Sequence, residues 1–154
     1  MTLNEHFGDS IPIDLSKEIN IIKIGDDNFS KYWNQFIENM PRCSWIYNRS
    51  IIDYYIESIS NVDNDFSFVV TNNKHVLAIV PLVISKNKSN ISFNFGENEL
   101  ALPCPLFSSL LSPKNLSKIE KLVFDLIVSI AIDNKVDYWF CEEHILSNKF
   151  LFFY

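Results

Sequence analysis

The fold depends on a stretch in the middle of the chain, residues 66–84, which reads FSFVVTNNKHVLAIVPLVI. Its opening alternates in polarity, as in a strand with one buried face. Asn72 and Asn73 tolerate the left-handed backbone of a tight turn, so residues 76–84 are predicted to return as the second strand of a hairpin. Because Pro81 has no backbone N–H, it is predicted to mark an edge or a bulge in that strand.

One strand and two helices are predicted before this hairpin. Residues 19–24 alternate and are β-branched, which is typical of a strand. Asp27 is a candidate cap for a helix whose apolar residues recur at helical spacing until Pro41. A second helix is predicted over residues 50–60, where Ser50 and the acid three residues later form a capping box.

Three further elements are predicted after the hairpin. Residues 91–95 alternate as a strand, and a proline-containing connection leads to an apolar helix that begins at Ser112 or Ser117. Residues 136–140 form the last strand. The sequence therefore predicts an α/β (α+β) fold with a mixed, mostly antiparallel sheet, two helices after the first strand and a buried helix before the last strand.

The chain is predicted to hold one domain. Residues 1–16 are polar and are expected to form a loosely ordered lead, whereas residues 17–154 are long enough to bury one core. The apolar ending at residues 150–154 suggests a domain that is incomplete at its C-terminus and able to self-associate or to bind a partner chain through residues 146–154.

Composition limits the partners and the compartment. The net charge is −6 and the basic residues are scattered, so a duplex nucleic acid is not an expected partner. No apolar run is long enough for a transmembrane segment. The three cysteines form no CxxC pair, which favours reduced thiols and a cytoplasmic location.

The loop between the two predicted helices is the first candidate site. Trp45 and Tyr47 present apolar faces with polar groups, and Arg42 and Arg49 could form paired hydrogen bonds with a carboxylate or phosphate. A structural interpretation is also open, in which Trp45 and Ile46 pack the helix pair together while the arginines are solvated.

The segment before the last helix argues against a nucleotide site. Coenzyme A sites use glycine-rich loops whose N–H groups contact pyrophosphate, whereas residues 102–107 read LPCPLF. Pro103 removes such a donor, so we expect no bound cofactor for this chain alone. Cys104 is a candidate nucleophile for a small hydrolase, although the sequence pairs no base with it.

A second polar cluster, residues 141–144, reads CEEH after the last predicted strand. Metal ions bind such side chains, but adjacent residues of an extended chain point to alternate faces. Solvated strand-end residues are therefore the favoured interpretation, and no metal site is expected.

The whole pattern resembles the N-terminal half of FemAB-like proteins, which are acyl- or aminoacyltransferases of the GNAT fold. The resemblance covers roughly residues 18–141. It is carried by five stretches, YWNQF at 32–36, CSWIY at 43–47, FSFVV at 66–70, AIVPL at 78–82 and LPCPL at 102–106.

This resemblance implies an acceptor-side half of an acyl- or aminoacyltransferase of cell-envelope or polysaccharide biosynthesis. The implied acceptor is a small molecule, a peptidoglycan precursor or a sugar. The implied donor is acyl-CoA or aminoacyl-tRNA, and it binds only if a second half is supplied. Arg42, Trp45, Tyr47, Arg49, Pro103 and Cys104 are the candidate substrate-binding residues, and no catalytic residue can be assigned. The alternative is a non-catalytic binding module that docks through its apolar C-terminal end.

Overall fold

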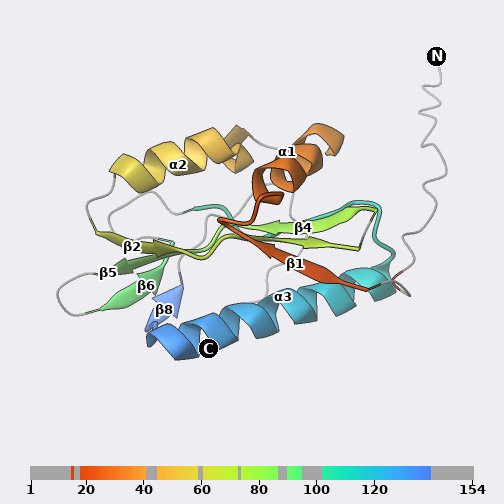
Figure 1. The fold of residues 1–154 in the computed structure, drawn as a ribbon. Helices are drawn as coiled ribbons and strands as arrows, with labels where there is room; N and C mark the ends of the chain where they lie inside the picture. Colours follow the sequence, from red (N-terminus) through yellow and green to blue (C-terminus); the bar gives the residue numbers. More distant parts are fainter. Residues whose placement is uncertain are drawn as a thin grey trace, which may run out of the picture.

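The computed structural model describes residues 15, 18–40, 45–58, 61–72, 74–86, 90–94 and 102–139. Within these residues the chain has a mixed α+β fold in three layers. Helices α1 (Phe29–Asn39) and α2 (Arg49–Ser58) cover one face of the strands, and α3 (Pro113–Asn134) covers the other (Figure 1). The predicted lead, apart from Leu15, and the predicted docking segment 146–154 lie outside the described residues.

The central hairpin is longer than predicted and each of its arms is interrupted once. One arm contains β2 (Val62–Asp65) and β3 (Phe68–Thr71), and the other contains β4 (Val76–Val80) and β5 (Val83–Lys86). The arms remain joined at the interruption, where Phe66 N donates to Leu82 O at 2.7 Å and Leu82 N donates to Ser67 Oγ at 3.2 Å. The predicted irregularity at Pro81 is confirmed.

Four shorter strands complete the layer. β1 (Asn20–Lys23) pairs with β3, β7 (Leu106–Phe107) pairs with β4, and β6 (Ile91–Phe93) pairs with β5, all antiparallel. β8 (Tyr138–Trp139) pairs with β6 and is parallel to it. The resulting four-stranded sheets have the orders β1-β3-β4-β7 and β2-β5-β6-β8. Because the hairpin arms run through both sheets, the two sheets form one layer (Figure 1).

Asn94 bridges the interruption in one arm of the hairpin. It is fully buried, and its Oδ1 accepts from Val83 N at 2.9 Å while its Nδ2 donates to Pro81 O at 3.3 Å. Its backbone has a φ of 57°, a left-handed conformation that asparagine tolerates better than most residues. The side chain therefore satisfies backbone groups that the interruption removes from the strand ladder.

The sheet separates two apolar cores. Val70 and Val80 pack toward α3, whereas Val69 and Ile79 pack toward α1 and α2. This alternation follows from the two-residue period of a strand. Both faces of β4 are buried, so β4 is a nearly continuous apolar run.

The helix starts differ from two of the predictions. Asp27 is not the cap of α1, because Asn28 occupies that position and makes no side-chain capping bond. α2 begins one residue early, and Asn48 Oδ1 accepts from Ser50 N at 3.2 Å, so the predicted capping box is also wrong. Of the two predicted starts of α3, Ser112 is the N-cap and its Oγ accepts from Asn115 N at 3.3 Å.

Candidate functional site

Tyr47 connects the first predicted site to the proline-rich segment. It ends a short 3-10 helix, Trp45–Tyr47, and is only 1% exposed. Trp33 Nε1 donates to Tyr47 O at 2.9 Å, and the Tyr47 hydroxyl donates to Cys104 O at 3.0 Å. Both polar groups are therefore used inside the protein, which favours a structural role for Tyr47.

Arg49 is also engaged internally. Its Nε donates to Asp53 Oδ1 at 2.7 Å, and its Nη2 pairs with Asp65 on β2. The guanidinium carbon lies 5.6 Å from the ring centroid of Phe29 and 5.7 Å from that of Trp33. At 12% side-chain exposure, Arg49 ties α2 to β2 and α1, so it is not presented to a ligand.

The remaining candidates of that loop have different outcomes. Trp45 is 64% exposed and so does not pack the helix pair together. Its predicted contact with a ligand stays a prediction. Arg42 lies outside the described residues, as do residues 141–144.

Cys104 corrects the prediction of reduced thiols, because it is disulfide-bonded. It is 8% exposed, and its neighbour Pro103 is buried as well. A disulfide sulfur has no thiolate, so Cys104 is not a nucleophile in this state. The structure thus brings Tyr47 and Cys104 together at a buried junction.

An open hollow of the described surface lies elsewhere, at the end of α1. It is a cleft of about 280 Å³. Its walls come from the last turns of α1, from the start of β4 and from the residues after β7. The lining residues are Gln35, Phe36, Asn39, Met40, His75, Val76, Ser108, Ser109 and Leu110.

Local hydrogen bonds position each wall of the cleft. Asn72 N donates to His75 O at 3.1 Å and Asn72 Oδ1 accepts from His75 N at 3.0 Å, which closes the turn before β4. Ser108 N donates to Leu77 O at 2.9 Å and so prolongs the pairing of β7 with β4. Ser109 Oγ lies 3.9 Å from Met40 Sδ and connects the third wall to α1.

The cleft offers hydrogen-bonding groups without formal charge. Within the described part of the chain, the side-chain amide of Gln35 and the ring of His75 have no hydrogen-bond partner, and Asn39 uses only its Nδ2, which donates to Gln35 O at 2.8 Å. Ser108 Oγ accepts from Leu110 N at 3.3 Å and can still donate. Such a lining suits a small neutral or singly charged polar ligand.

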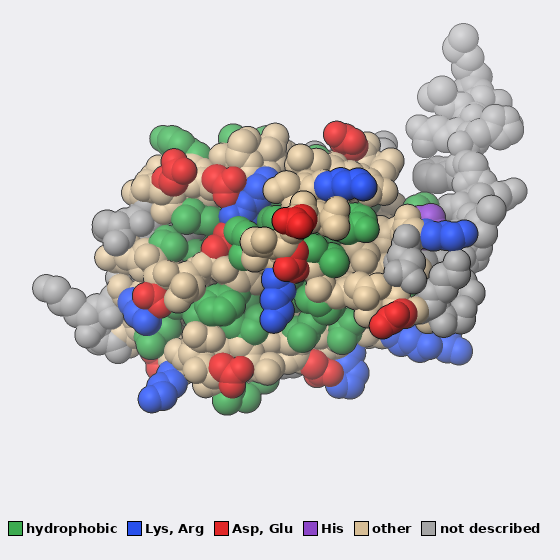
Figure 2. All heavy atoms as spheres, in the orientation of Figure 1, with side chains coloured by type: hydrophobic (Ala, Val, Ile, Leu, Met, Phe, Trp, Pro, Cys, Tyr) green, Lys and Arg blue, Asp and Glu red, His purple; other side chains and the backbone are tan. Residues whose placement is uncertain are grey.

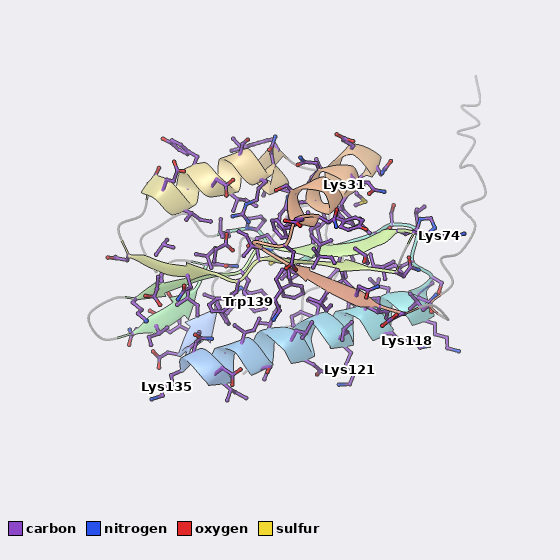
Figure 3. The ribbon with its side chains drawn as sticks, viewed as in Figure 1. Lys31, Lys74, Lys118, Lys121, Lys135 and Trp139 are labelled. Carbon is purple, nitrogen blue, oxygen red and sulfur yellow. The ribbon has the colours of Figure 1, made fainter. Side chains whose placement is uncertain are left out.

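The cleft contains no formed catalytic pair. Among the described residues, no hydrogen bond joins His75 to Ser108 or Ser109, and no group of three metal-binding side chains occurs. Figure 2 shows acidic and basic side chains interspersed over the face in view. Figure 3 places Lys74 beside the start of β4.

The residues that line the cleft are far apart in the chain, so the sequence did not predict the cleft. Gln35 and Asn39 are four residues apart on α1, a spacing that puts them on one helix face. That spacing was the only available signal. His75 and Ser108 join them only through the pairing of β4 with β7.

Comparison of the chain with protein-family models, with curated proteins and with solved structures finds no significant match. None of the helices in the described ranges is long and apolar enough to cross a bilayer.

Proposed function

We propose that this chain is an acceptor-side half of a GNAT-like, FemAB-type acyl- or aminoacyltransferase. The observation that carries the proposal is the strand order. Strands β1 to β7 come first and pair antiparallel, the long helix α3 then crosses one face, and β8 returns parallel to β6. α1 and α2 lie on the opposite face, between β1 and β2 in the chain (Figure 1).

The cleft supplies an acceptor site within this proposal. An acceptor of the resembling family carries an amine on a sugar or a peptide. Gln35 and Asn39 offer amide oxygens that accept from an ammonium or a hydroxyl, and Ser108 can donate. In the transfer step the neutral amine attacks a thioester or ester carbonyl, and backbone donors stabilise the oxyanion. The C–S or C–O bond then breaks, and the thiol or hydroxyl of the donor leaves with the proton that the amine loses. A second half would provide the donor site.

Calorimetry with amine-bearing acceptors and acyl-CoA tests the proposal. An amino sugar or a lysine-containing peptide is expected to bind the chain alone, whereas acyl-CoA is not. Gln35→Ala should weaken acceptor binding about tenfold, because it removes one hydrogen bond to a charged group. Asn34→Ala, a change at the neighbouring exposed position of α1, should leave binding unchanged.

Two results contradict the proposal. Acyl-CoA binding by this chain alone would show a donor site that the proposal assigns to another half. Absence of binding by both acceptor classes would remove the acceptor role.

A binding module without chemistry is the second candidate. Val128 and Ile132, one turn apart on α3, are 55% and 72% exposed, which is unusual for large apolar residues. Sedimentation at increasing concentration tests this candidate, and a monomer at every concentration argues against self-association.

A cytoplasmic location belongs to the transferase proposal, although the disulfide at Cys104 favours an oxidising compartment.

A further inference from the structure

We propose that the outward face of α3 binds the same face of a second copy of this chain, with the two helices antiparallel. This inference rests on the second candidate function, the binding module, and names its partner and its surface. α1, which carries one wall of the cleft, lies on the other side of the sheet, so the contact leaves the cleft accessible (Figure 1).

Six exposed residues of α3 form one continuous strip along its outward face. Their spacings alternate between four and three residues, and this spacing keeps side chains on the side of a helix that can contact a second helix. Figure 3 shows Lys118 and Lys121 on the side of α3 that points away from the sheet. The six residues are Lys114, Lys118, Lys121, Asp125, Val128 and Ile132.

Charge divides this strip into two unlike halves. The N-terminal half carries the three lysines, whereas the C-terminal half carries Asp125 followed by two apolar residues. Those two, Val128 and Ile132, are 55% and 72% exposed, which leaves a large apolar surface in water. A parallel copy of α3 would bring lysine against lysine, which is unfavourable. An antiparallel copy instead places the lysines opposite the aspartate and the apolar residues.

Antiparallel pairing about a two-fold axis matches the six positions in three layers, each of which occurs twice. The layers are Lys121 with Asp125, Lys118 with Val128, and Lys114 with Ile132. In the central layer, Lys121 and Asp125, which are 2.7 Å apart within one chain, can exchange partners across the axis. In the outer layers, lysine stems cover the apolar side chains of the second copy while their ammonium groups stay in water.

The size of the strip limits the strength of the contact. α3 has 22 residues and is therefore about 33 Å long. A strip that is one helix wide belongs to the small end of specific interfaces, which bury roughly 800 Å² on each partner. The central ion pairs are exposed, so salt screens them. We therefore expect a weak dimer whose dissociation constant rises with salt concentration.

Sedimentation equilibrium of the full-length protein and two variants tests the surface. Ile132→Gln should raise the dissociation constant about tenfold, because a symmetric dimer loses the apolar burial twice. Tyr54→Gln is the matched control and should leave the dissociation constant unchanged, since Tyr54 is 64% exposed on α2, on the other side of the sheet. A monomer at every concentration contradicts this inference and the second candidate function together. A dimer that Ile132→Gln leaves intact contradicts this inference alone.

Exchange of the central charges tests the register. Lys121→Glu puts like charges in the central layer and should abolish the dimer at low salt. The double variant Lys121→Glu, Asp125→Lys returns opposite charges to that layer and should restore the wild-type dissociation constant. A dimer shifted along α3, with Asp125 beside Lys135 of the second copy, would not be restored, because the double variant then sets lysine against lysine. A double variant that stays monomeric therefore overturns the proposed register.

Discussion

At the residue scale, Arg49 shows how a plausible binding group becomes a structural one. Its guanidinium pairs with Asp65, which is 15% exposed, and lies over two aromatic rings. Asp65 is held further by Ser67 N, which donates to its Oδ1 at 2.8 Å. Removing the arginine would leave a largely buried carboxylate without its partner charge.

We therefore expect Arg49→Met to lower the free energy of unfolding by about 2–4 kcal/mol in urea titrations. Lys121→Met is the matched control, because the Lys121–Asp125 pair has side chains that are 75% and 63% exposed. That substitution should cost no more than about 0.5 kcal/mol. Equal, small losses in both variants would show that Arg49 does not hold α2 in place.

At the element scale, α3 is specified by its N-terminus. Ser112 Oγ accepts from Asn115 N, and Pro113 provides a backbone angle suited to the first turn. The C-cap of α3 is Lys135, which has a φ of 54° and donates its backbone N–H to Ile132 O at 3.2 Å. α3 packs against one face of the sheet and encloses one of the two apolar cores. Loss of its cap should therefore lower the stability of the whole domain.

Ser112→Ala should lower the free energy of unfolding by about 1 kcal/mol, because the Asn115 N–H loses its acceptor. Ser117→Ala should be neutral or stabilising by up to about 0.5 kcal/mol, since alanine has the higher helix propensity inside a helix. Thermal unfolding followed by circular dichroism measures both. A larger loss at Ser117 would place the helix start there instead.

At the scale of the whole molecule, Asn94 links the two sheets into one layer. It satisfies backbone groups of Val83 and Pro81 at the interruption of the hairpin arm. A substitution there affects both sheets at once, because β4 belongs to one and β5 to the other.

Asn94→Ala should therefore lower the free energy of unfolding by about 2–3 kcal/mol, through a buried N–H without an acceptor and a less favourable left-handed backbone. The exposed Asn90, just before β6, is the control, and Asn90→Ala should change stability by less than about 0.5 kcal/mol. Hydrogen exchange checks the mechanism, since protection should fall in β4 and β5 together. A loss confined to β6 would contradict a joint role.

The sequence by itself determined the elements whose signals are local. Alternation placed β1, β3 and β6, apolar periodicity placed the helices, and Pro81 marked the interruption, because each signal depends on a backbone period or on a missing N–H. The short strands β2 and β7 were not predicted, since β2 reads VDND and has no alternation of apolar and polar residues, and the two residues of β7 are too few to show one.

Only the tertiary structure decided which side chains meet. The pairing of β4 with β7 brings His75 and Ser108 to the same cleft. The packing of α2 gives Arg49 a structural role, because it places the guanidinium beside Asp65. The hydrogen bond from Tyr47 to Cys104 O joins residues that are 57 positions apart. These contacts join residues that are distant in the chain, and their geometry follows from how the layers pack. No local pattern contains that information, which explains why the cleft and the disulfide were missed.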